Sequence, residues 1–263
     1  MLGRKMRGVL SFLLLGLSLV SGFCEEFKTK VFRVMTYNIH HGQGPDGQFD
    51  LERIAELIKL EKADIVALQE VDRGTLRTAR RDLPAELARL TGMNFVFEKN
   101  IDYQGGEYGN AILTRFPILE VTNLHYSMTQ AQEQRGLLQA LLGVEGRKLL
   151  FMSTHLDYRS AAERLRNVAQ IREVREAAPD RPVIVCGDFN DGPGSQIHKR
   201  LSEFLTDVWN IAGNGNGFTF SSTRPLSRID YIWISKGVVA VKAWIPQSKA
   251  SDHLSIVAEF ALE

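Results

Sequence analysis

Short apolar runs separated by polar turns recur along the chain from Val31 onward. Runs of this kind are typical of β-strands, and about eleven strands are predicted. Several follow one another as hairpins, such as residues 138–142 and 149–153, which turn at Glu145 and Gly146. The predicted strands cover residues 31–38, 64–69, 94–98, 109–114, 117–126, 136–144, 147–154, 182–186, 229–234, 238–245 and 254–260.

Three amphipathic helices are predicted between these strands. Asp50 precedes apolar residues spaced i, i+3, i+4 and i+7, and Ser160 with Glu163 forms a capping box before a second such pattern. A third helix covers about residues 84–90 and ends at Gly92. The strands are too many, and the helices too few, for a closed eight-fold barrel. We therefore expect an α/β fold of two packed mixed sheets with outer helices.

The composition is that of a globular protein with a large core. The chain has 263 residues, of which 44% are hydrophobic and 24% charged, and this excludes a disordered, collagen-like or coiled-coil protein. No linker, low-complexity tract or charge block interrupts the sequence after Val31. We expect one domain over residues 25–263.

The first 24 residues have the pattern of a secretory signal peptide. A basic start at residues 4–7 precedes an apolar run over residues 9–20 and two small residues. Because this run is too short to cross a bilayer comfortably, we expect a secreted or periplasmic protein rather than a membrane span. Cys24 raises the alternative of a lipid anchor, which the bulky Phe23 before it disfavours.

Removal of residues 1–24 takes three of the 32 basic residues and none of the 31 acidic ones, which leaves a balance of −2. This balance provides no strong attraction to a polyanion. Cys186 is then the one remaining cysteine, so an intramolecular disulfide is excluded. Its place in the apolar run 183–186 indicates a buried strand thiol rather than a nucleophile.

Side chains that can ligate a metal or move a proton gather at the ends of the predicted strands. Each alone has an ordinary explanation, such as a turn residue, a solvated carboxylate or a core histidine. Together they indicate a functional site, because a globular core does not need so many of them. These residues are Asn38, Glu70, His155, Asp188 and Asn190 after strands, and Asp230, Asp252 and His253 at the starts of strands.

Three of these carboxylates, Glu70, Asp188 and Asp252, favour a divalent cation, since carboxylates packed together repel one another unless a cation holds them ionised. Asn38 and Asn190 would add neutral oxygen ligands or hydrogen-bond donors. This set suits Mg²⁺, Mn²⁺ or Ca²⁺ rather than Zn²⁺. Mg²⁺ or Mn²⁺ is the predicted cofactor, because such ions most often serve phosphoryl transfer.

The histidines add acid–base chemistry. An imidazole oriented by a carboxylate can act as a general base or donate to a phosphoryl oxygen, and Asp230 is available as that partner for His253. A serine hydrolase is disfavoured because no Gly-x-Ser-x-Gly motif occurs. A P-loop enzyme is disfavoured because no Gly-x-x-x-x-Gly-Lys-Ser/Thr motif occurs.

Short polar motifs follow one another in order along residues 31–260. They are Thr36-Tyr37-Asn38, Gln69-Glu70-Val71-Asp72, Tyr108-Gly109-Asn110-Ala111-Ile112-Leu113, Ser153-Thr154-His155-Leu156, Gly187-Asp188-Phe189-Asn190, Arg228-Ile229-Asp230-Tyr231 and Ser251-Asp252-His253. In this order they resemble the endonuclease/exonuclease/phosphatase superfamily, the DNase I-like proteins. The resemblance implies a four-layer α/β/β/α sandwich of two mixed β-sheets with outer helices, and metal-dependent cleavage of phosphoester bonds.

The resemblance also implies roles at the metal and the water. Glu70 resembles the principal metal ligand, Asn38 its neighbour, and Asp252 a metal-side carboxylate. Asp188 and Asn190 resemble the pair that orients the attacking water and contacts the phosphate.

The same resemblance implies that His253 is the base or phosphate-stabilising imidazole and Asp230 its partner. His155 matches a position that is His in the DNase I and sphingomyelinase branches but Tyr in the abasic-site endonucleases. An abasic-site repair enzyme is therefore disfavoured. No carboxylate partner for His155 is identifiable in the sequence.

Two further groups are predicted to bind substrate. Asn110 and Arg115 resemble phosphate-side residues, although Arg115 could equally be a solvated strand end. The segment after Glu70 is rich in arginine and suits bidentate phosphate binding, the alternative being a solvated basic loop paired with nearby acids. Its arginines are Arg73, Arg77, Arg80 and Arg81.

The predicted function is an exported, divalent-metal-dependent phosphoesterase that hydrolyses a phosphodiester or phosphomonoester by in-line attack of water. A secreted nuclease is an alternative, although DNA tracking normally requires a basic stripe. A sphingomyelinase-like hydrolase of phospholipid head groups is another, but Trp209, Trp233 and Trp244 all occur in strand-like contexts typical of a core. A non-catalytic binding protein is disfavoured because every ligand position is filled. We expect a monomer without a stable protein partner.

Overall fold

The computed structural model describes residues 30–129 and 133–263. The predicted signal peptide, residues 1–24, lies outside them. Within the described residues, no helix is both long and apolar enough to span a membrane.

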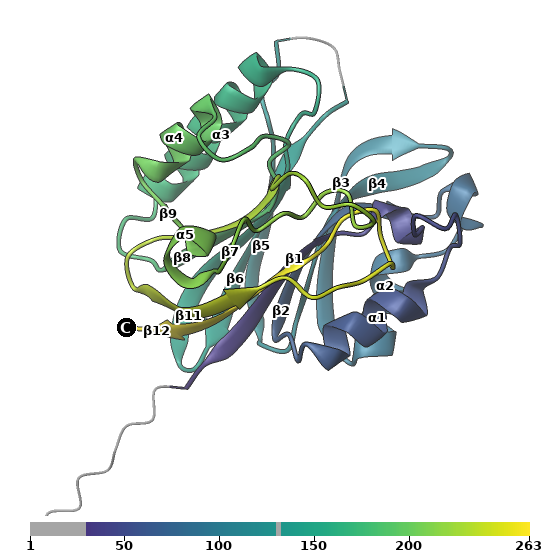
Figure 1. The fold of residues 1–263 in the computed structure, drawn as a ribbon, viewed down its shortest axis with the longest axis horizontal. Coiled ribbons are helices and arrows are strands. Elements are labelled where there is room, and N and C mark those ends of the chain that lie inside the picture. The colour runs from purple at the N-terminus through teal and green to yellow at the C-terminus, as the bar shows by residue number, and fades with distance from the viewer. Residues whose placement is uncertain (1–29, 130–132) are drawn as a thin grey trace, which may run out of the picture.

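Two six-stranded mixed sheets form the middle of the molecule (Figure 1). The strands are β1 (Phe32–Asn38), β2 (Ile65–Arg73), β3 (Asn94–Tyr103), β4 (Gly106–Thr114), β5 (Ile118–His125), β6 (Gly136–Val144), β7 (Arg147–His155), β8 (Val183–Asp188), β9 (Thr206–Asp207), β10 (Asp230–Ile234), β11 (Val238–Trp244) and β12 (Ile256–Leu262). The first sheet has the order β11-β12-β1-β2-β4-β3 and the second has the order β5-β6-β7-β8-β10-β9.

Within the described residues, five helices pack on the two sheets, four on the outer faces and the shortest against the core between the sheets. They are α1 (Leu51–Leu60), α2 (Leu83–Thr91), α3 (Ala161–Glu176), α4 (Gln196–Ser202) and α5 (Val208–Ala212), with short 3-10 turns η1 (His40–Gly42) and η2 (Leu76–Thr78). The helices α1 and α2 share a core cluster with the first sheet, whereas α3 and α4 share one with the second. The expected four-layer sandwich is confirmed.

Alternating side chains build the layers. In β1, Val34 belongs to the core between the sheets, while its neighbour Met35 belongs to the core beneath α1 and α2. This two-residue period leaves both faces of the strand buried, as in other sheets covered on both sides. Cys186 is buried between the sheets, as predicted for a strand thiol.

The helix caps follow the sequence signals with one difference. Asp50 and Ser160 are N-caps whose side chains accept backbone N–H bonds, and Gly92 ends α2 with a left-handed φ of 68°. The expected capping box at Ser160 is only half formed. The Glu163 carboxylate accepts the backbone N–H of Thr129 at 3.1 Å, so it ties α3 to a neighbouring loop.

Besides the two 3-10 turns, three short elements were not predicted, namely β9, α4 and α5. The two helices have only seven and five residues, too few for a helical period to stand out. Trp209 lies in α5 rather than in a strand, although it packs into the core as expected. The strands β2 and β3 extend further than predicted, to Arg73 and Tyr103.

The sheet topology brings distant strand ends to one edge. The parallel pair β1 and β2 aligns Asn38 with Gln69, and the parallel pair β7 and β8 aligns His155 with Asp188. The antiparallel strand β10 begins beside the end of β8, where Asp230 pairs with Asp188. Polar residues far apart in the chain therefore meet where the sheets end.

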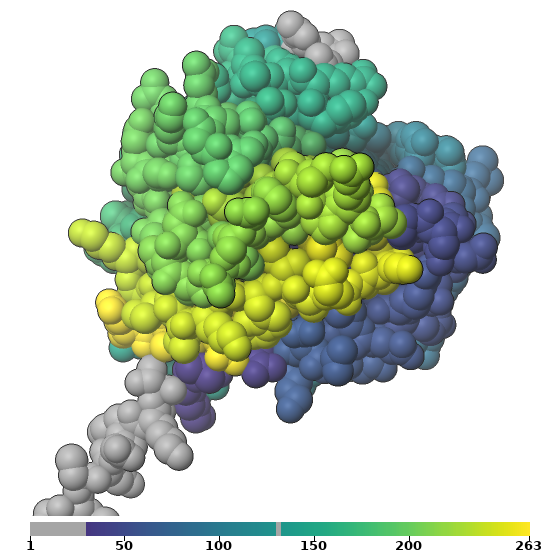
Figure 2. All heavy atoms as spheres, in the orientation of Figure 1, coloured from purple at the N-terminus to yellow at the C-terminus, as the bar shows by residue number. Residues whose placement is uncertain are grey.

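The last segment of the chain completes this edge. β12 is antiparallel to β1 and pairs Ile256 with Thr36, so the loop before β12 lies at the end of β1. Asp252 and His253 belong to that loop. In the space-filling view the C-terminal segment, in yellow, fills the seam between the green segment and the purple and blue N-terminal part (Figure 2).

Gly187 holds β8 close to β7, next to the predicted catalytic Asp188. A Cβ atom at Gly187 would lie 1.9 Å from the carbonyl oxygen of Thr154. We predict that Gly187→Ala lowers the free energy of unfolding by about 2–3 kcal/mol, because the strands must separate to admit the methyl group. Gly192→Ala is the control, since a Cβ there meets nothing within 4 Å. Equal denaturation midpoints for the two variants would contradict this prediction.

Candidate active site

A cavity of about 430 Å³ opens at the edge where the strand ends gather. Most of the predicted catalytic and metal-binding side chains line it, and the lining members are Glu70, His155, Asp188, Asn190, Asp252 and His253. The other two, Asn38 and Asp230, are buried and hydrogen-bond to members of that set. The structure thus brings together all eight side chains.

A β-bulge places Glu70 in the cavity. The pairing of β2 with β4 is regular as far as Leu68 and resumes at Val71. Glu70 lies in this break with a left-handed φ of 57°, which a residue with a side chain seldom adopts. Bulges re-aim a side chain and are common beside active sites.

Asn38 joins two of the carboxylates. Its Nδ2 donates to Glu70 Oε1 at 3.0 Å and to Asp188 Oδ2 at 3.1 Å. Its Oδ1 accepts the backbone N–H of His40 at 3.1 Å. Of the two roles expected for Asn38, ligand or donor, the structure therefore shows the donor, and a single amide sets the spacing of the two acids.

The surroundings of Asp188 disfavour the ionised form of its carboxylate. It is buried and lies directly across from the buried Asp230 on β10. Burial, followed by the charge of Asp230, raises the pKa of Asp188 to about 7, although His253 works in the opposite direction. The backbone N–H of Asn190 donates to Asp188 Oδ1 at 2.9 Å, which holds the carboxylate in place.

His253 is held between the two aspartates. Its Nδ1 lies 2.9 Å from Asp230 Oδ2, and its Nε2 lies 3.7 Å from Asp188 Oδ2. Burial lowers the pKa of His253 and is the largest single influence on it, but the carboxylates of Asp230, Asp188 and Asp252 together outweigh burial and raise this pKa to about 10. The imidazole is therefore a cation at neutral pH, with Nε2–H facing Asp188.

His155 has an arginine partner that was not predicted from the sequence. Nη1 of the buried Arg135 donates to His155 Nδ1 at 3.0 Å. Because a guanidinium only donates, Nδ1 must carry the lone pair and Nε2 the proton. Burial, and then Arg135, lower the pKa of His155 well below its usual range, so the ring stays neutral. Its Nε2 lies 3.6 Å from Asp188 Oδ2.

Asp252 is partly exposed, with 33% of its side chain accessible. It lines the cavity together with Glu70. Among the described residues its one ion-pair partner is His40, with Nδ1 of the ring 3.9 Å from Asp252 Oδ1, and Glu70 has none. These two acids are open to a cation in solution.

Three of the four arginines after Glu70 form hydrogen bonds with groups that do not line the cavity. Arg73 donates to Glu107 at 2.6 Å and Arg81 to Glu86 at 2.8 Å. Arg80 donates to backbone carbonyl oxygens, the shortest of these bonds being 2.6 Å to Gly105. The predicted substrate-binding role of Arg73 is not supported, because its guanidinium is paired and does not line the cavity.

Arg77 is the arginine of this segment that lines the cavity. Its Nε and Nη2 donate to the buried Asp72 at 2.6 and 2.8 Å. Its guanidinium also lies over the rings of Tyr103 and Tyr108, which line the cavity too. Arg77 therefore presents a fixed positive charge between two aromatic walls.

The two residues expected to contact the phosphate lie in different parts of the first sheet. Asn110 is buried on β4 opposite the bulge of Glu70, and its Nδ2 donates to Gly136 O at 3.3 Å. Arg115 follows the far end of β4, where Thr114 pairs with Ile65 at the start of β2. Because β4 is antiparallel to β2, Arg115 is at the opposite edge of the sheet and cannot bind a substrate in the cavity.

The donor set fits a divalent cation. Glu70 and Asp252 are carboxylates facing one cavity without a lysine or arginine partner among the described residues, and Asp188 adds a third acid nearby. Oxygen ligands of this kind suit Mg²⁺ or Mn²⁺. Asp188, Asp230 and His253 form a second compact group whose ligand atoms lie within 4.8 Å of one another, but Asp230 and His253 already bond to each other.

We predict that Asp230→Asn lowers the pKa of His253 from about 10 toward its ordinary value of 6.5. The substitution removes the largest of the charges that oppose burial, and burial disfavours the imidazolium. The measurement is an NMR titration of the imidazole signals in metal-free protein, with the exposed His125 as an internal control. A His253 pKa that stays near 10 would show that Asp230 does not set its charge.

Comparisons with known proteins agree with this geometry. The model of the Endonuclease/Exonuclease/phosphatase family matches residues 35–253. "Uncharacterized protein YbhP" of Escherichia coli (strain K12) is 30% identical over 251 residues, covering 88% of this chain and 96% of that protein. Nocturnin of Homo sapiens is 26% identical, covering 79% of this chain and 57% of its own length.

A solved structure supports the same assignment. The endonuclease/exonuclease/phosphatase from Beutenbergia cavernae DSM 12333 superimposes with a TM-score of 0.73 at 26% identity, covering 88% of this chain and 72% of that one. Motif order, fold and site geometry lead to one conclusion. The chain belongs to the endonuclease/exonuclease/phosphatase family.

Proposed function

We propose that this protein is an exported phosphoesterase that depends on Mg²⁺ or Mn²⁺ and hydrolyses a compact phosphodiester or phosphomonoester by in-line attack of water. Members of its family are phosphoester hydrolases. The observation that carries the proposal is the Asn38 amide, which links Glu70 to Asp188 while two imidazoles face Asp188. Metal-side and water-side groups are thus held in one rigid unit.

Glu70 and Asp252 would hold the cation, with Asn38 keeping Glu70 in position. A bound divalent ion supplies neutralisation of the charge on the phosphoryl group. Both acids face the cavity in which the ion would bind.

Asp188, His253 and His155 would accept or donate protons during the reaction. Asp188, with a pKa near 7, can accept the proton of an attacking water. His253 is cationic and donates through Nε2, so it can stabilise negative charge on a phosphoryl oxygen. His155 is neutral and also donates through Nε2, because Arg135 occupies Nδ1. Two donors and one acceptor would therefore be available to a phosphoryl group bound in the cavity.

The cavity favours a compact substrate over a DNA duplex. Its volume is about 430 Å³, and its walls include Tyr103, Tyr108 and Phe220. The neighbouring arginine segment adds little charge for a long polyanion, since Arg77 is its one member in the cavity and is paired with Asp72. A polyanion-tracking nuclease needs many free basic contacts.

Export is proposed from the first 24 residues. Their basic start, apolar run and small residues are typical of a signal peptide. The substrate would then be met outside the cytoplasm, as a small molecule or a lipid head group.

Hydrolysis of model esters tests the function. Purified protein is assayed on bis-p-nitrophenyl phosphate, p-nitrophenyl phosphate, DNA and sphingomyelin, with Mg²⁺, with Mn²⁺ and with EDTA. We expect turnover of a small ester that EDTA abolishes and that Glu70→Gln lowers by about 100-fold or more. Glu107→Gln is the matched control, because Glu107 pairs with Arg73 outside the cavity.

The outcome separates the alternatives. Preferential loss of DNA would support a nuclease, and preferential cleavage of sphingomyelin would support a lipid head-group hydrolase. Turnover that persists in EDTA, or is lost equally in both glutamate variants, would contradict the proposal. Hydrolysis of none of the substrates would favour a binding protein.

Asp188→Asn should remove activity and yet stabilise the metal-free fold. The pKa of Asp188 is raised in the folded state, so the carboxylate destabilises the protein above about pH 7 and ceases to do so as pH falls toward the unfolded value of 3.8. We expect the melting temperature in EDTA at pH 8 to rise by about 2–8 °C. The gain should shrink at pH 5. A variant less stable than wild type at both pH values would contradict the repulsion.

A further inference from the structure

Two histidines at the edge of the cavity have no part in the chemistry described above. His40 and His41 form the turn η1, directly after the strand end that carries Asn38. Both have left-handed backbones, with φ of 43° and 45°. Side chains in this region cost free energy, and such strain persists where the surrounding structure holds it in place.

The fold imposes this turn. Asn38 Oδ1 accepts the N–H of His40 at 3.1 Å, and Gly42 N–H bonds to Ile39 O at 2.8 Å. Gly42 is buried with φ of 89°, and a Cβ there would lie 2.9 Å from the ring of Phe49. The turn is therefore fixed at both ends, and the two imidazoles project from it together.

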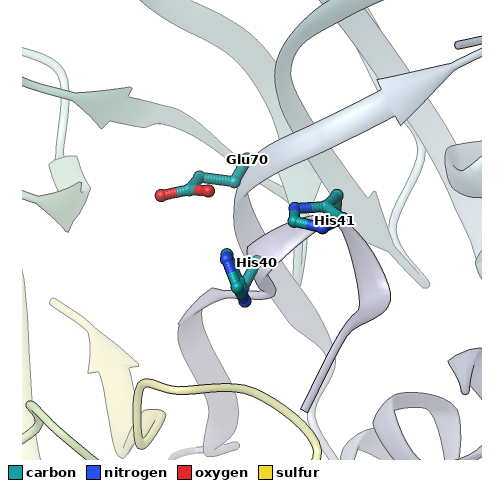
Figure 3. Close-up of side chains that lie close together, drawn as sticks. All are labelled: His40, His41 and Glu70. Carbon is teal, nitrogen blue, oxygen red and sulfur yellow. The ribbon is translucent and has the colours of Figure 1, made fainter. Parts of the chain in front are cut away.

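The turn brings both imidazoles to Glu70. Figure 3 shows His40 and His41 beside the Glu70 side chain, where η1 approaches β2. One ligand atom from each of the three residues can be chosen so that all lie within 4.8 Å of one another. A metal bound to each at about 2.1 Å separates its ligands by about 3–3.5 Å, so small side-chain rotations close the site.

The hydrogen bonding of the His40 and His41 rings leaves a nitrogen of each ring available to bind a metal. His40 Nδ1 donates to the carbonyl oxygen of Gln43 at 3.2 Å, which leaves the lone pair on Nε2. Metal-binding histidines usually donate their other nitrogen to a carbonyl or carboxylate in this way. His41 Nδ1 is buried and has no hydrogen-bond partner. A buried polar nitrogen without a partner is costly unless a ligand satisfies it.

We propose that His40, His41 and Glu70 form a binding site for a divalent transition-metal ion, with Zn²⁺ as its probe. Two imidazoles and one carboxylate suit such ions, whereas Mg²⁺ prefers oxygen ligands alone. The proposal deepens the proposed function, because Glu70 is shared with the magnesium position, but zinc binding itself does not require hydrolysis. Transition metals would thus compete with or join Mg²⁺ at this edge of the cavity.

The test is zinc binding measured by calorimetry, together with the ¹⁵N chemical shifts of labelled histidines in the full chain. We expect one Zn²⁺ to shift ring nitrogens of both His40 and His41. The single variants His40→Asn and His41→Asn, and the double variant, should each weaken zinc affinity about tenfold or more. Asparagine tolerates a left-handed backbone, so these variants should keep the turn. His125→Asn, at an exposed histidine, is the control.

Zinc affinity unchanged in the double variant, or ring shifts confined to other histidines, would overturn the site. Melting curves of every variant without metal check that the fold is retained. Where the double variant is unstable, the zinc affinity of the single variants decides the test. Hydrolysis is measured separately with Mg²⁺ and no zinc. Zinc binding through the histidines without any hydrolysis would reject the proposed function alone, whereas hydrolysis with unaltered zinc binding would reject this site alone.

Discussion

The structure depends on two aspartates that the fold forces together. Asp188 and Asp230 face each other across neighbouring strands, and both are buried. Like charges in that arrangement are unfavourable unless cations or hydrogen bonds compensate them. His253 bonds to Asp230, while Asn38 and the backbone of Asn190 bond to Asp188. The polar network holds these acids in place, and the burial of their charges costs stability that the three apolar core clusters must supply.

Holding the acids also fixes the neighbouring donors. Asp230 keeps His253 charged, and Arg135 keeps His155 neutral with its proton on Nε2. One cationic and one neutral imidazole therefore face the same oxygen of Asp188. A site preorganised in this way stabilises charge without rearranging during the reaction. In the proposed function, these fixed donors would give a sandwich of ordinary strands its capacity for phosphoester chemistry.

Much of this arrangement could be predicted from the sequence, because strand ends are marked by local apolar periodicity and the polar residues follow directly. Other features depend on pairing between distant strands. The bulge at Glu70 arises from the register of β2 and β4, and the distance of Arg115 from the cavity arises from the direction of β4. Arg135 and His40 gave no local signal, since the fold is what brings Arg135 to His155 and His40 to Glu70.

The central claim is that a divalent cation occupies the cavity between Glu70 and Asp252. The most direct measurement is an anomalous difference map from a crystal grown with Mn²⁺, with data collected above and below the manganese edge. The account predicts a manganese peak in contact with both carboxylates, on the Asn38 side of the cavity. A map with no peak at Glu70 while the cavity is open to solvent would contradict the claim.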